Sequence, residues 1–293
     1  MGKVVAPPLP HHAVKVAPRA RRPRFGPVDV LAWSILGVAL IVAVLPFFWT
    51  LLNSFKLGRD IATVPPKVVF QPILDNYTTV FSANVHELLL TTAIVTVGSV
   101  TTALTIGSLG GYALARYKHG MFKLLGLWVF SERFLPTIVF ILPLFIMFTE
   151  LGLTGTRFGL VLAYQVFALP VTIWLTWGFF SQVPYEMEEA AMMDGCNRLQ
   201  AFLKVSLPVA LPGIGAAAVV TTIFSWNQFL VPFILGGRHA QVITTQVARY
   251  VGGEDVAAYW GELSALAVII VAPVILLGFV LNRPLLRGLL GRH

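Results

Sequence analysis

The sequence predicts an all-α integral membrane protein with six transmembrane helices and both termini in the cytoplasm. Hydrophobic residues make up 57% of the 293 positions and charged residues 12%, whereas soluble domains carry about 25% charged residues. The apolar residues are also clustered, because 31–52, 88–115 and 158–180 contain no charged side chain. Each run can cross a hydrocarbon core of ~30 Å at ~1.5 Å per residue. An open chain in lipid must be helical there, to satisfy its own backbone hydrogen bonds.

The predicted elements follow in order along the chain. Residues 1–29 hold six prolines and six basic residues, which predicts a disordered cytoplasmic tail. Residues 30–293 are predicted to form one transmembrane domain. The apolar run after the tail is too long for the core of a signal peptide, so we expect it to remain as the first span. The six predicted spans are about 31–52, 88–115, 124–148, 158–180, 209–235 and 263–281.

Lysine and arginine orient these spans, because they collect on the cytoplasmic side of a membrane. With the N-terminus inside, fourteen of them fall on inside segments and six on outside segments, while Arg133 lies within a span. This distribution places both termini and the loop between the fourth and fifth spans in the cytoplasm. The two long loops, 53–87 and 236–262, are expected outside.

Several kinds of site are disfavoured by composition. Cys196 is the single cysteine, which excludes an intrachain disulfide. The six histidines lie in tails and loops without metal-ligand spacing, so no metal site is predicted. The net charge of +8 would suggest nucleic acid in a soluble protein, but here it follows from membrane topology, and no nucleic-acid partner is expected.

The second predicted span contains two glycines four residues apart, Gly107 and Gly111. Small residues at this spacing lie on one face of a helix and allow a second helix to approach closely. We therefore expect a helix-packing seam at these positions.

A polar stretch, 189–208, separates the fourth and fifth spans. Pro184 suits the first turn of a helix, and acidic residues after it favour the positive end of the helix dipole. Gly195 is a natural helix stop, and Asn197 with Gln200 has the spacing of a capping box for a second helix. One face of the first helix carries Met187, Ala190, Ala191 and Asp194. The small alanine side chains would let another protein approach this acidic face closely. The face therefore favours docking of a soluble cytoplasmic protein over contact with an anionic membrane surface.

The same stretch resembles the cytoplasmic EAA loop of ABC importer permeases. That motif consists of Glu-Ala-Ala, three residues, Gly, nine residues, Ile, one residue and Leu-Pro. The matching positions are Glu189, Ala190, Ala191, Gly195, Val205, Leu207 and Pro208, with Val in place of Ile. Five further stretches resemble the shorter permease of maltose-like carbohydrate importers: "PFFWTLLNSFK" (46–56), "DNYTTVF" (75–81), "GGYALARYKHGMF" (110–122), "LPTIVFILPLF" (135–145) and "WNQFL" (226–230).

The resemblance implies a transport subunit that works with several partners. The loop would couple the spans to a cytoplasmic ATP-binding subunit through Glu189, Ala190, Ala191, Asp194, Gly195, Leu207 and Pro208. The implied partners are a homologous second permease, two copies of the ATPase and an extracytoplasmic solute-binding protein, in the lipid of a bacterial cytoplasmic membrane. The sequence lacks G-x-x-x-x-G-K-[ST], so we expect a non-catalytic chain without a cofactor, with ATP and Mg²⁺ bound by the partner.

Polar and aromatic residues inside the predicted spans are candidates for a solute pathway. They are Glu132, Arg133, Tyr164, Gln165, Trp226, Asn227 and Gln228. Charged groups in a membrane normally face a cavity or a partner, so the first two either line the path or tether the helix. The aromatic and amide groups suit a sugar, but interhelical packing and hydrogen bonding would explain them as well.

A sugar or related small polar solute is the implied substrate, with a polyol or a glycerol phosphodiester as the alternative. An ion-coupled secondary carrier would keep ionisable groups near the midplane, whereas Glu132 is the one carboxylate clearly inside a predicted span. A membrane-embedded enzyme would need an intramembrane histidine or a Ser/His/Asp set, which the predicted spans lack. The sequence therefore favours an ATP-driven importer.

Overall fold

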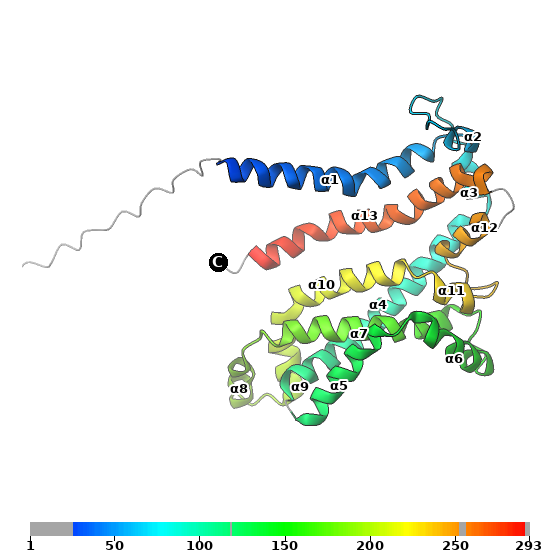
Figure 1. Cartoon of the computed structure of the whole chain (residues 1–293). Helices are drawn as coiled ribbons and strands as arrows, with labels where there is room; N and C mark the ends of the chain where they lie inside the picture. Colours follow the sequence, from blue (N-terminus) through cyan, green and yellow to red (C-terminus); the bar gives the residue numbers. More distant parts are fainter. Residues whose placement is uncertain (1–25, 118, 252–255, 291–293) are drawn as a thin grey trace, which may run out of the picture. The chain divides into compact units, whose positions relative to one another are not determined.

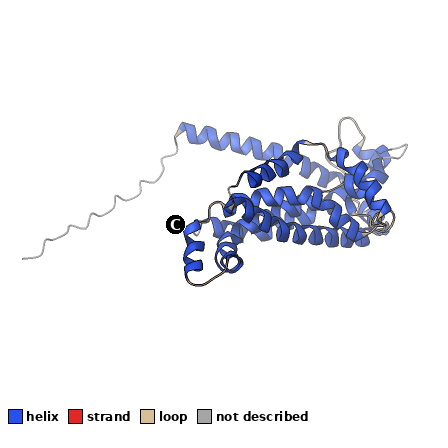
Figure 2. Cartoon of the chain, turned by 90° about the horizontal axis from the view of Figure 1, so that it is seen from below, coloured by secondary structure: helices blue, strands red, loops and turns tan. Residues whose placement is uncertain are grey.

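The computed structural model describes residues 26–117, 119–251 and 256–290, and the chain divides into two compact units, 1–47 and 48–293. Within the described ranges every regular element is helical (Figure 2). Five of the described helices are long and apolar enough to cross a membrane. The prediction of an all-α fold built on membrane-length helices is therefore confirmed.

The first membrane-length helix, α1 (Pro27–Asn53), begins in the first unit. Its large apolar side chains are exposed on all sides, and none of its most apolar window is buried. A helix that is apolar all round is typical of one covered by lipid or by another protein. Because the helix begins at Pro27, the last three residues of the predicted tail are helical, while residues 1–25 lie outside the described residues.

The second unit contains a bundle of four long helices (Figure 1). They are α4 (Val85–Arg116), α7 (Arg157–Phe180), α10 (Leu207–Trp226) and α13 (Trp260–Leu290). α4 packs along α7, α10 packs against both of them, and α13 packs against α10. The bundle thus joins segments that lie far apart in the sequence.

Close approach of α4 and α7 depends on the two glycines of the predicted seam. A Cβ atom at Gly107 would lie 2.7 Å from Thr172 Cγ2, and one at Gly111 would overlap Thr176 Oγ1 and lie 2.7 Å from the Trp177 backbone nitrogen. Hydrogen is the one side chain that fits at these distances. The structure therefore confirms the expected helix-packing seam.

Hydroxyl groups link α7 to α10 inside the bundle. Thr172 Oγ1 and Thr221 Oγ1 are buried and 2.9 Å apart. We expect Thr172→Val to lower the free energy of unfolding by about 0.6 kcal/mol, and by no more than about 1.7 kcal/mol, the range measured for such bonds in membranes. The measurement is the thermal unfolding midpoint in mild detergent.

The matched control for this variant is Thr222→Val, because the Thr222 hydroxyl bonds to the Ala218 carbonyl of its own helix. The control is expected to leave the midpoint nearly unchanged. Equal midpoints for both variants would show that the hydroxyl contact contributes nothing to holding α7 against α10.

The third predicted span, 124–148, is not one helix. It comprises α5 (Gly120–Ser131), a 3₁₀ turn (Glu132–Phe134) and α6 (Thr137–Glu150). The interruption follows from Pro136, which has no backbone N–H and disfavours helical geometry in the preceding residue. Leu135 is accordingly extended, with φ −86° and ψ 134°.

The fifth predicted span, 209–235, also differs from the structure at both ends. α10 ends at Trp226, and a separate short helix, α11 (Leu230–Leu235), follows. At the other end, α9 (Arg198–Ala201) runs through a π-helical segment (Phe202–Ser206) directly into α10.

Pro208 lies in the first turn of α10, and the helix is continuous there with the π-helical segment and α9. A proline inside an α-helix lacks a donor and crowds the carbonyl four residues earlier, here that of Lys204. The π-helical segment lies just before Pro208. Such wider turns relieve this crowding and let the helix continue.

The two ends of α4 lie in different surroundings. Near its start, the Thr92 hydroxyl accepts a hydrogen bond from the backbone N–H of Ile243, 2.9 Å away, in the 3₁₀ turn Ile243–Gln246. At its last residue, Arg116 forms an ion pair with α8 (Tyr185–Met193). The helix between these contacts is ~36 Å long, more than the thickness of a hydrocarbon core. α8 and the 236–251 segment thus lie at opposite ends of the bundle (Figure 1).

A buried cluster of polar side chains links the segment after α1 to α3 (Asp75–Ser82). The Asn76 side-chain amide donates to the backbone carbonyls of Ser54 and Lys56, at 2.9 and 2.8 Å. Lys56 is only 1% exposed, and its ammonium group lies over the rings of Trp49 and Phe70. These contacts give two of the quoted stretches, 46–56 and 75–81, a shared structural role.

Candidate functional site

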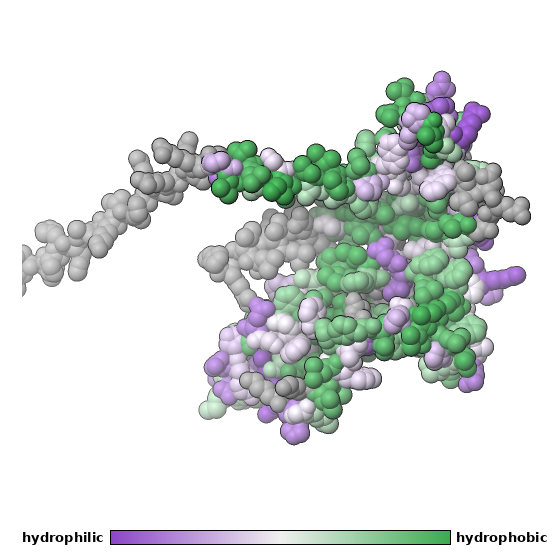
Figure 3. All heavy atoms as spheres, viewed as in Figure 1, coloured by the Kyte–Doolittle hydropathy of each residue, from purple (hydrophilic) through white to green (hydrophobic). Residues whose placement is uncertain are grey.

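The polar stretch between α7 and α10 forms two short helices around a glycine bend. α8 begins after Pro184, carries acidic residues in its first turn and ends at Met193. Glu189, Ala190 and Asp194 are exposed. Hydrophilic side chains gather around α8 and α9 (Figure 3), which distinguishes this end of the bundle from the apolar flanks.

Gly195 adopts a left-handed backbone conformation, with φ +90°. The chain turns there because the Gly195 and Cys196 amides bond back to the Met192 and Ala191 carbonyls, at 3.1 and 3.0 Å. No atom lies within 4 Å of a Cβ built on Gly195. The requirement for glycine is therefore one of backbone conformation and not of space within this chain.

The second short helix starts with the predicted capping box. Asn197 Oδ1 accepts from the Gln200 backbone N–H at 2.9 Å, and Gln200 Oε1 accepts from the Asn197 N–H at 3.0 Å. This pair satisfies two donors that a helix start leaves unpaired. α9 therefore has a defined start, and it continues into α10.

Beneath the exposed face, α8 is anchored by Glu188, whose side chain is 4% exposed. Its Oε1 atom accepts from Arg116 Nε at 2.7 Å and also from the Ser206 hydroxyl, and its Oε2 atom accepts from the Tyr112 hydroxyl at 2.9 Å. These donors come from the end of α4 and from the π-helical segment. A single carboxylate thus joins α8 to two long helices.

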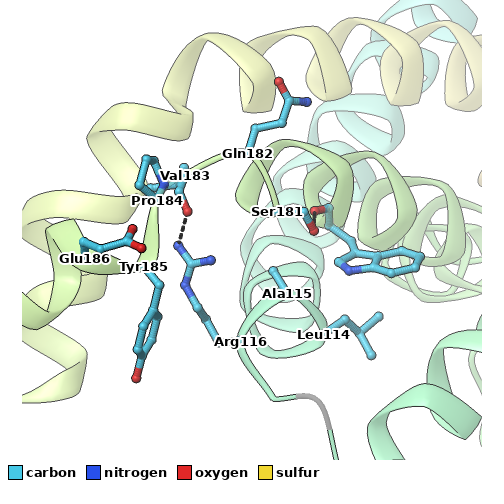
Figure 4. Close-up of a pocket in the computed structure, with 10 residues that line it drawn as sticks. Leu114, Ala115, Arg116, Ser181, Gln182, Val183, Pro184, Tyr185 and Glu186 are labelled. Atoms are coloured by element: carbon cyan, nitrogen blue, oxygen red, sulfur yellow. Dashed lines mark hydrogen bonds between the residues drawn. The ribbon is translucent and has the colours of Figure 1, made fainter.

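Arg116 extends this anchor to the end of α7. Its terminal nitrogens donate to the Phe180 and Val183 carbonyls, at 3.2 and 3.1 Å. Figure 4 shows the guanidinium group pointing at Val183, with the Tyr185 ring beside it. These residues border a groove of about 900 Å³ that Glu186 also lines.

The predicted coupling residues fall into two positions. Glu189, Ala190, Ala191, Asp194 and Gly195 lie together on α8 and its C-terminal bend, exposed or half-exposed. Leu207 and Pro208 lie at the start of α10, where Leu207 packs against a buried apolar cluster that contains Phe180 and Phe202. The first group is a surface, and the second connects that surface to the bundle.

Sequence reasoning missed Glu188 and Arg116. A signal was present, because neighbouring residues point about 100° apart on a helix, so Glu186, Glu188 and Glu189 cannot all lie on one exposed face. One acidic side chain had to point inward and needed a basic partner. Arg116, the last residue of the second predicted span, was available for that role.

The candidate pathway residues occupy three different places. Tyr164 and Gln165 are buried between helices, and the Gln165 amide donates to the Ser99 and Val161 carbonyls, at 3.2 and 2.8 Å. Trp226 lies at the end of α10.

Trp226 and the remaining pathway candidates lie where helices end or are interrupted. Trp226 Nε1 donates to the Ile270 carbonyl in α13 at 3.0 Å, Asn227 is exposed, and the Gln228 carbonyl accepts from Thr244 at 2.6 Å. Glu132 is half-exposed in the 3₁₀ turn that divides the third span. Arg133 shares that turn, and its side chain lies outside the described residues.

Comparison with known proteins identifies related transport proteins. The diacetylchitobiose uptake system permease protein NgcG of Streptomyces coelicolor is 32% identical over 255 residues, covering 86% of this chain and 84% of the relative. The trehalose transport system permease protein SugB of Mycobacterium tuberculosis is 32% identical over 265 residues, covering 88% and 94%.

Solved structures share the fold. A chain of a bacterial ABC transporter involved in the import of the acidic polysaccharide alginate superposes with a TM-score of 0.71 at 22% identity, covering 89% of this chain and 99% of that chain. Residues 103–290 match the family model described as a binding-protein-dependent transport system inner membrane component. This chain therefore belongs to the family of inner membrane components of binding-protein-dependent transport systems, and it is a membrane-spanning transport permease.

Proposed function

We propose that this chain is the permease subunit of an ATP-driven importer, in which α8 transmits ATPase movement to the spans. The observation that carries the proposal is the exposed α8 surface, which is joined by a buried carboxylate to long helices of the bundle. The motif spacing from Glu189 to Pro208 supports it. ATP and Mg²⁺ would be bound by a separate subunit, because this sequence has no phosphate-binding loop of its own.

The docking face comprises α8 and its bend. The small side chains of Ala190 and Ala191 allow a partner to approach this face closely, and the exposed Glu189 carboxylate would pair with a basic groove of the ATP-binding subunit. Gly195 sets the angle between α8 and α9 through its positive φ. Asp194 caps the C-terminal end of α8, within the surface that the ATP-binding subunit would cover.

The proposed topology has six spans, with both termini and α8 in the cytoplasm. α5 and α6 together would provide the third crossing, since neither is long enough alone. The segment 236–251, at the opposite end of α4 from α8, would face the extracytoplasmic solute-binding protein. A homologous second permease and two copies of the ATPase would complete the complex.

The solute is proposed to be a sugar or a related small polar compound. The two 32% identical relatives are named for diacetylchitobiose uptake and trehalose transport. The divided third span supports a route past Glu132 and Arg133, because interrupted helices commonly line transport sites. Trp226, Asn227 and Gln228, at the end of α10, are proposed to line the same route. Tyr164 and Gln165 are proposed to hold helices together.

The first test is the energy source for uptake in proteoliposomes that contain the purified complex. We expect solute entry to require internal ATP and to continue when a protonophore and a sodium ionophore together collapse the proton and sodium gradients. Uptake that needs the gradient and ignores ATP would support an ion-coupled carrier instead. Thermal stabilisation of the co-purified binding protein by sugars, polyols and glycerol phosphodiesters would then identify the solute class.

The second test concerns Glu189 at the docking face. We expect Glu189→Lys to weaken retention of the ATP-binding subunit about tenfold or more. The lysine would be repelled by the proposed basic groove, and the ion pair of Glu189 with that groove would be lost, at a combined cost of ~1.4 kcal/mol or more. Retention is measured by co-purification with the tagged permease at fixed salt. Because no span is altered, insertion in the membrane should be normal.

The control is Glu87→Lys, which reverses an exposed charge in the first turn of α4, at the end of that helix opposite to Arg116 and α8. We expect this variant to retain more of the ATP-binding subunit than Glu189→Lys does. Equal retention in both variants and the wild type would contradict docking through Glu189.

A further inference from the structure

The ion pair between Glu188 and Arg116 lies at the junction of α8 with the bundle. Arg116 Nη2 is 2.7 Å from Glu188 Oε1, and the two side chains are 8% and 4% exposed. At this depth the pair is shielded from water, so its attraction is stronger than that of a surface pair. It also points away from the exposed residues of α8, which leaves a docking partner no access to it.

The two groups together bond to each segment that meets at this point. Glu188 accepts from Tyr112 in α4 and from Ser206 in the π-helical segment. Arg116 donates to the carbonyls of Phe180, the last residue of α7, and of Val183 in the following turn. The joint therefore includes the ends of α4 and α7, the start of the α10 helix, and α8.

The chemistry of both partners suits a rigid joint. A guanidinium group has a planar set of five donors, so Arg116 can bond a carboxylate and two carbonyls at once, whereas a lysine ammonium cannot reproduce that geometry. A positive charge at the end of α7 also favours the negative end of its helix dipole. Removing either partner leaves the other buried and unpaired, which is costly. α8 thus cannot tilt alone without breaking this cluster.

We propose that Glu188 and Arg116 are positioning residues that make α8 move as one body with the ends of α4, α7 and α10. This inference rests on the proposed function, because it assigns the joint through which ATPase movement reaches the spans. Without the ion pair, α8 is held by its two flanking turns, of which the preceding one contains Val183, a member of the buried apolar cluster with Phe180 and Phe202. Those connections keep the helix folded but allow it to pivot.

The test measures coupling separately from docking. In a Cys196→Ser background, Met193→Cys supplies a thiol on α8 at a residue that is 88% exposed, for cross-linking to the ATP-binding subunit. Reconstituted complexes are then assayed for ATP hydrolysis with and without loaded binding protein, and for solute imported per ATP hydrolysed. Thermal unfolding in detergent reports the integrity of each variant.

Glu188→Gln keeps the shape of the side chain and removes its charge. We expect normal cross-linking and basal hydrolysis, but a fall of at least about fivefold in solute imported per ATP, the low end of coupling between two sites. Arg116→Lys keeps the charge and loses the planar set of donors, so solute imported per ATP should fall in this variant as well. Tyr112→Phe loses one hydrogen bond and keeps the ion pair, so it should retain most of the coupling.

Two results would overturn this inference. Glu188→Gln and Arg116→Lys could both import solute at the wild-type ratio, which would show that the joint is not needed for coupling. Alternatively, both could lose cross-linking together with Tyr112→Phe, which would show a role in holding the docking surface itself. If the chain with Met193→Cys and Cys196→Ser, but with Glu188 and Arg116 unchanged, failed to cross-link, this would instead contradict the proposed function.

Discussion

Gly111→Val is expected to prevent stable folding of the permease. A Cβ at this position would overlap Thr176 Oγ1 and lie 2.7 Å from the Trp177 nitrogen and 3.0 Å from the Ile173 carbonyl oxygen. Two of these atoms belong to the α7 backbone and cannot rotate away. α4 and α7 would have to separate along their shared contact, at a cost of about 3 kcal/mol or more, the upper end for overpacked interiors. The measurement is the amount of monodisperse protein recovered in mild detergent, together with its unfolding midpoint.

Gly178→Val provides the matched control, because Gly178 is an exposed glycine of α7 with no atom within 4 Å of a Cβ built on it. The two variants share the change in side chain and its effect on helix propensity, and they differ in the helix contact. We expect the control to be recovered at close to the wild-type level. Normal recovery of Gly111→Val would contradict the close approach of α4 and α7 at this seam.

Gly195→Val is expected to abolish the stimulation of ATP hydrolysis by loaded binding protein. Gly195 has a φ of +90°, a conformation in which a β-branched residue is strongly disfavoured. Holding valine there would cost about 1–3 kcal/mol, so the chain would relax to a different turn and change the angle between α8 and α9. The space around Gly195 is open, so the effect would arise from the backbone alone. The measurement is stimulated hydrolysis in proteoliposomes.

The control is Gly195→Asn, because asparagine is the side chain that best tolerates a positive φ at a helix end. We expect this variant to keep a large part of the stimulation, although its side chain is bulkier than that of glycine. If asparagine and valine were equally damaging, contact with the ATP-binding subunit would matter more than the turn. If neither were damaging, the bend would have no part in coupling.

The sequence by itself determined most of the membrane-length helices and the position of the candidate coupling loop. Hydropathy is a local property, and a helix satisfies its backbone hydrogen bonds within its own segment, so the apolar runs predicted α1, α4, α7 and most of α10 and α13. The glycine bend and the capping box were also predictable, because their bonds join residues only three to five positions apart. The seam at Gly107 and Gly111 followed from spacing on one helix face.

The tertiary structure alone decided how the loop is fixed to the bundle and where the spans are interrupted. Glu188 and Arg116 are 72 positions apart, and each of the three acidic residues of α8 was an equal candidate for pointing inward until the bundle selected one. Whether Pro136 and Pro208 would break a helix also depended on the surroundings. The chain divides at Pro136, but before Pro208 a π-helical segment relieves the crowding and the helix continues. Such outcomes depend on which distant groups are available as partners, and this is decided only when the helices pack together.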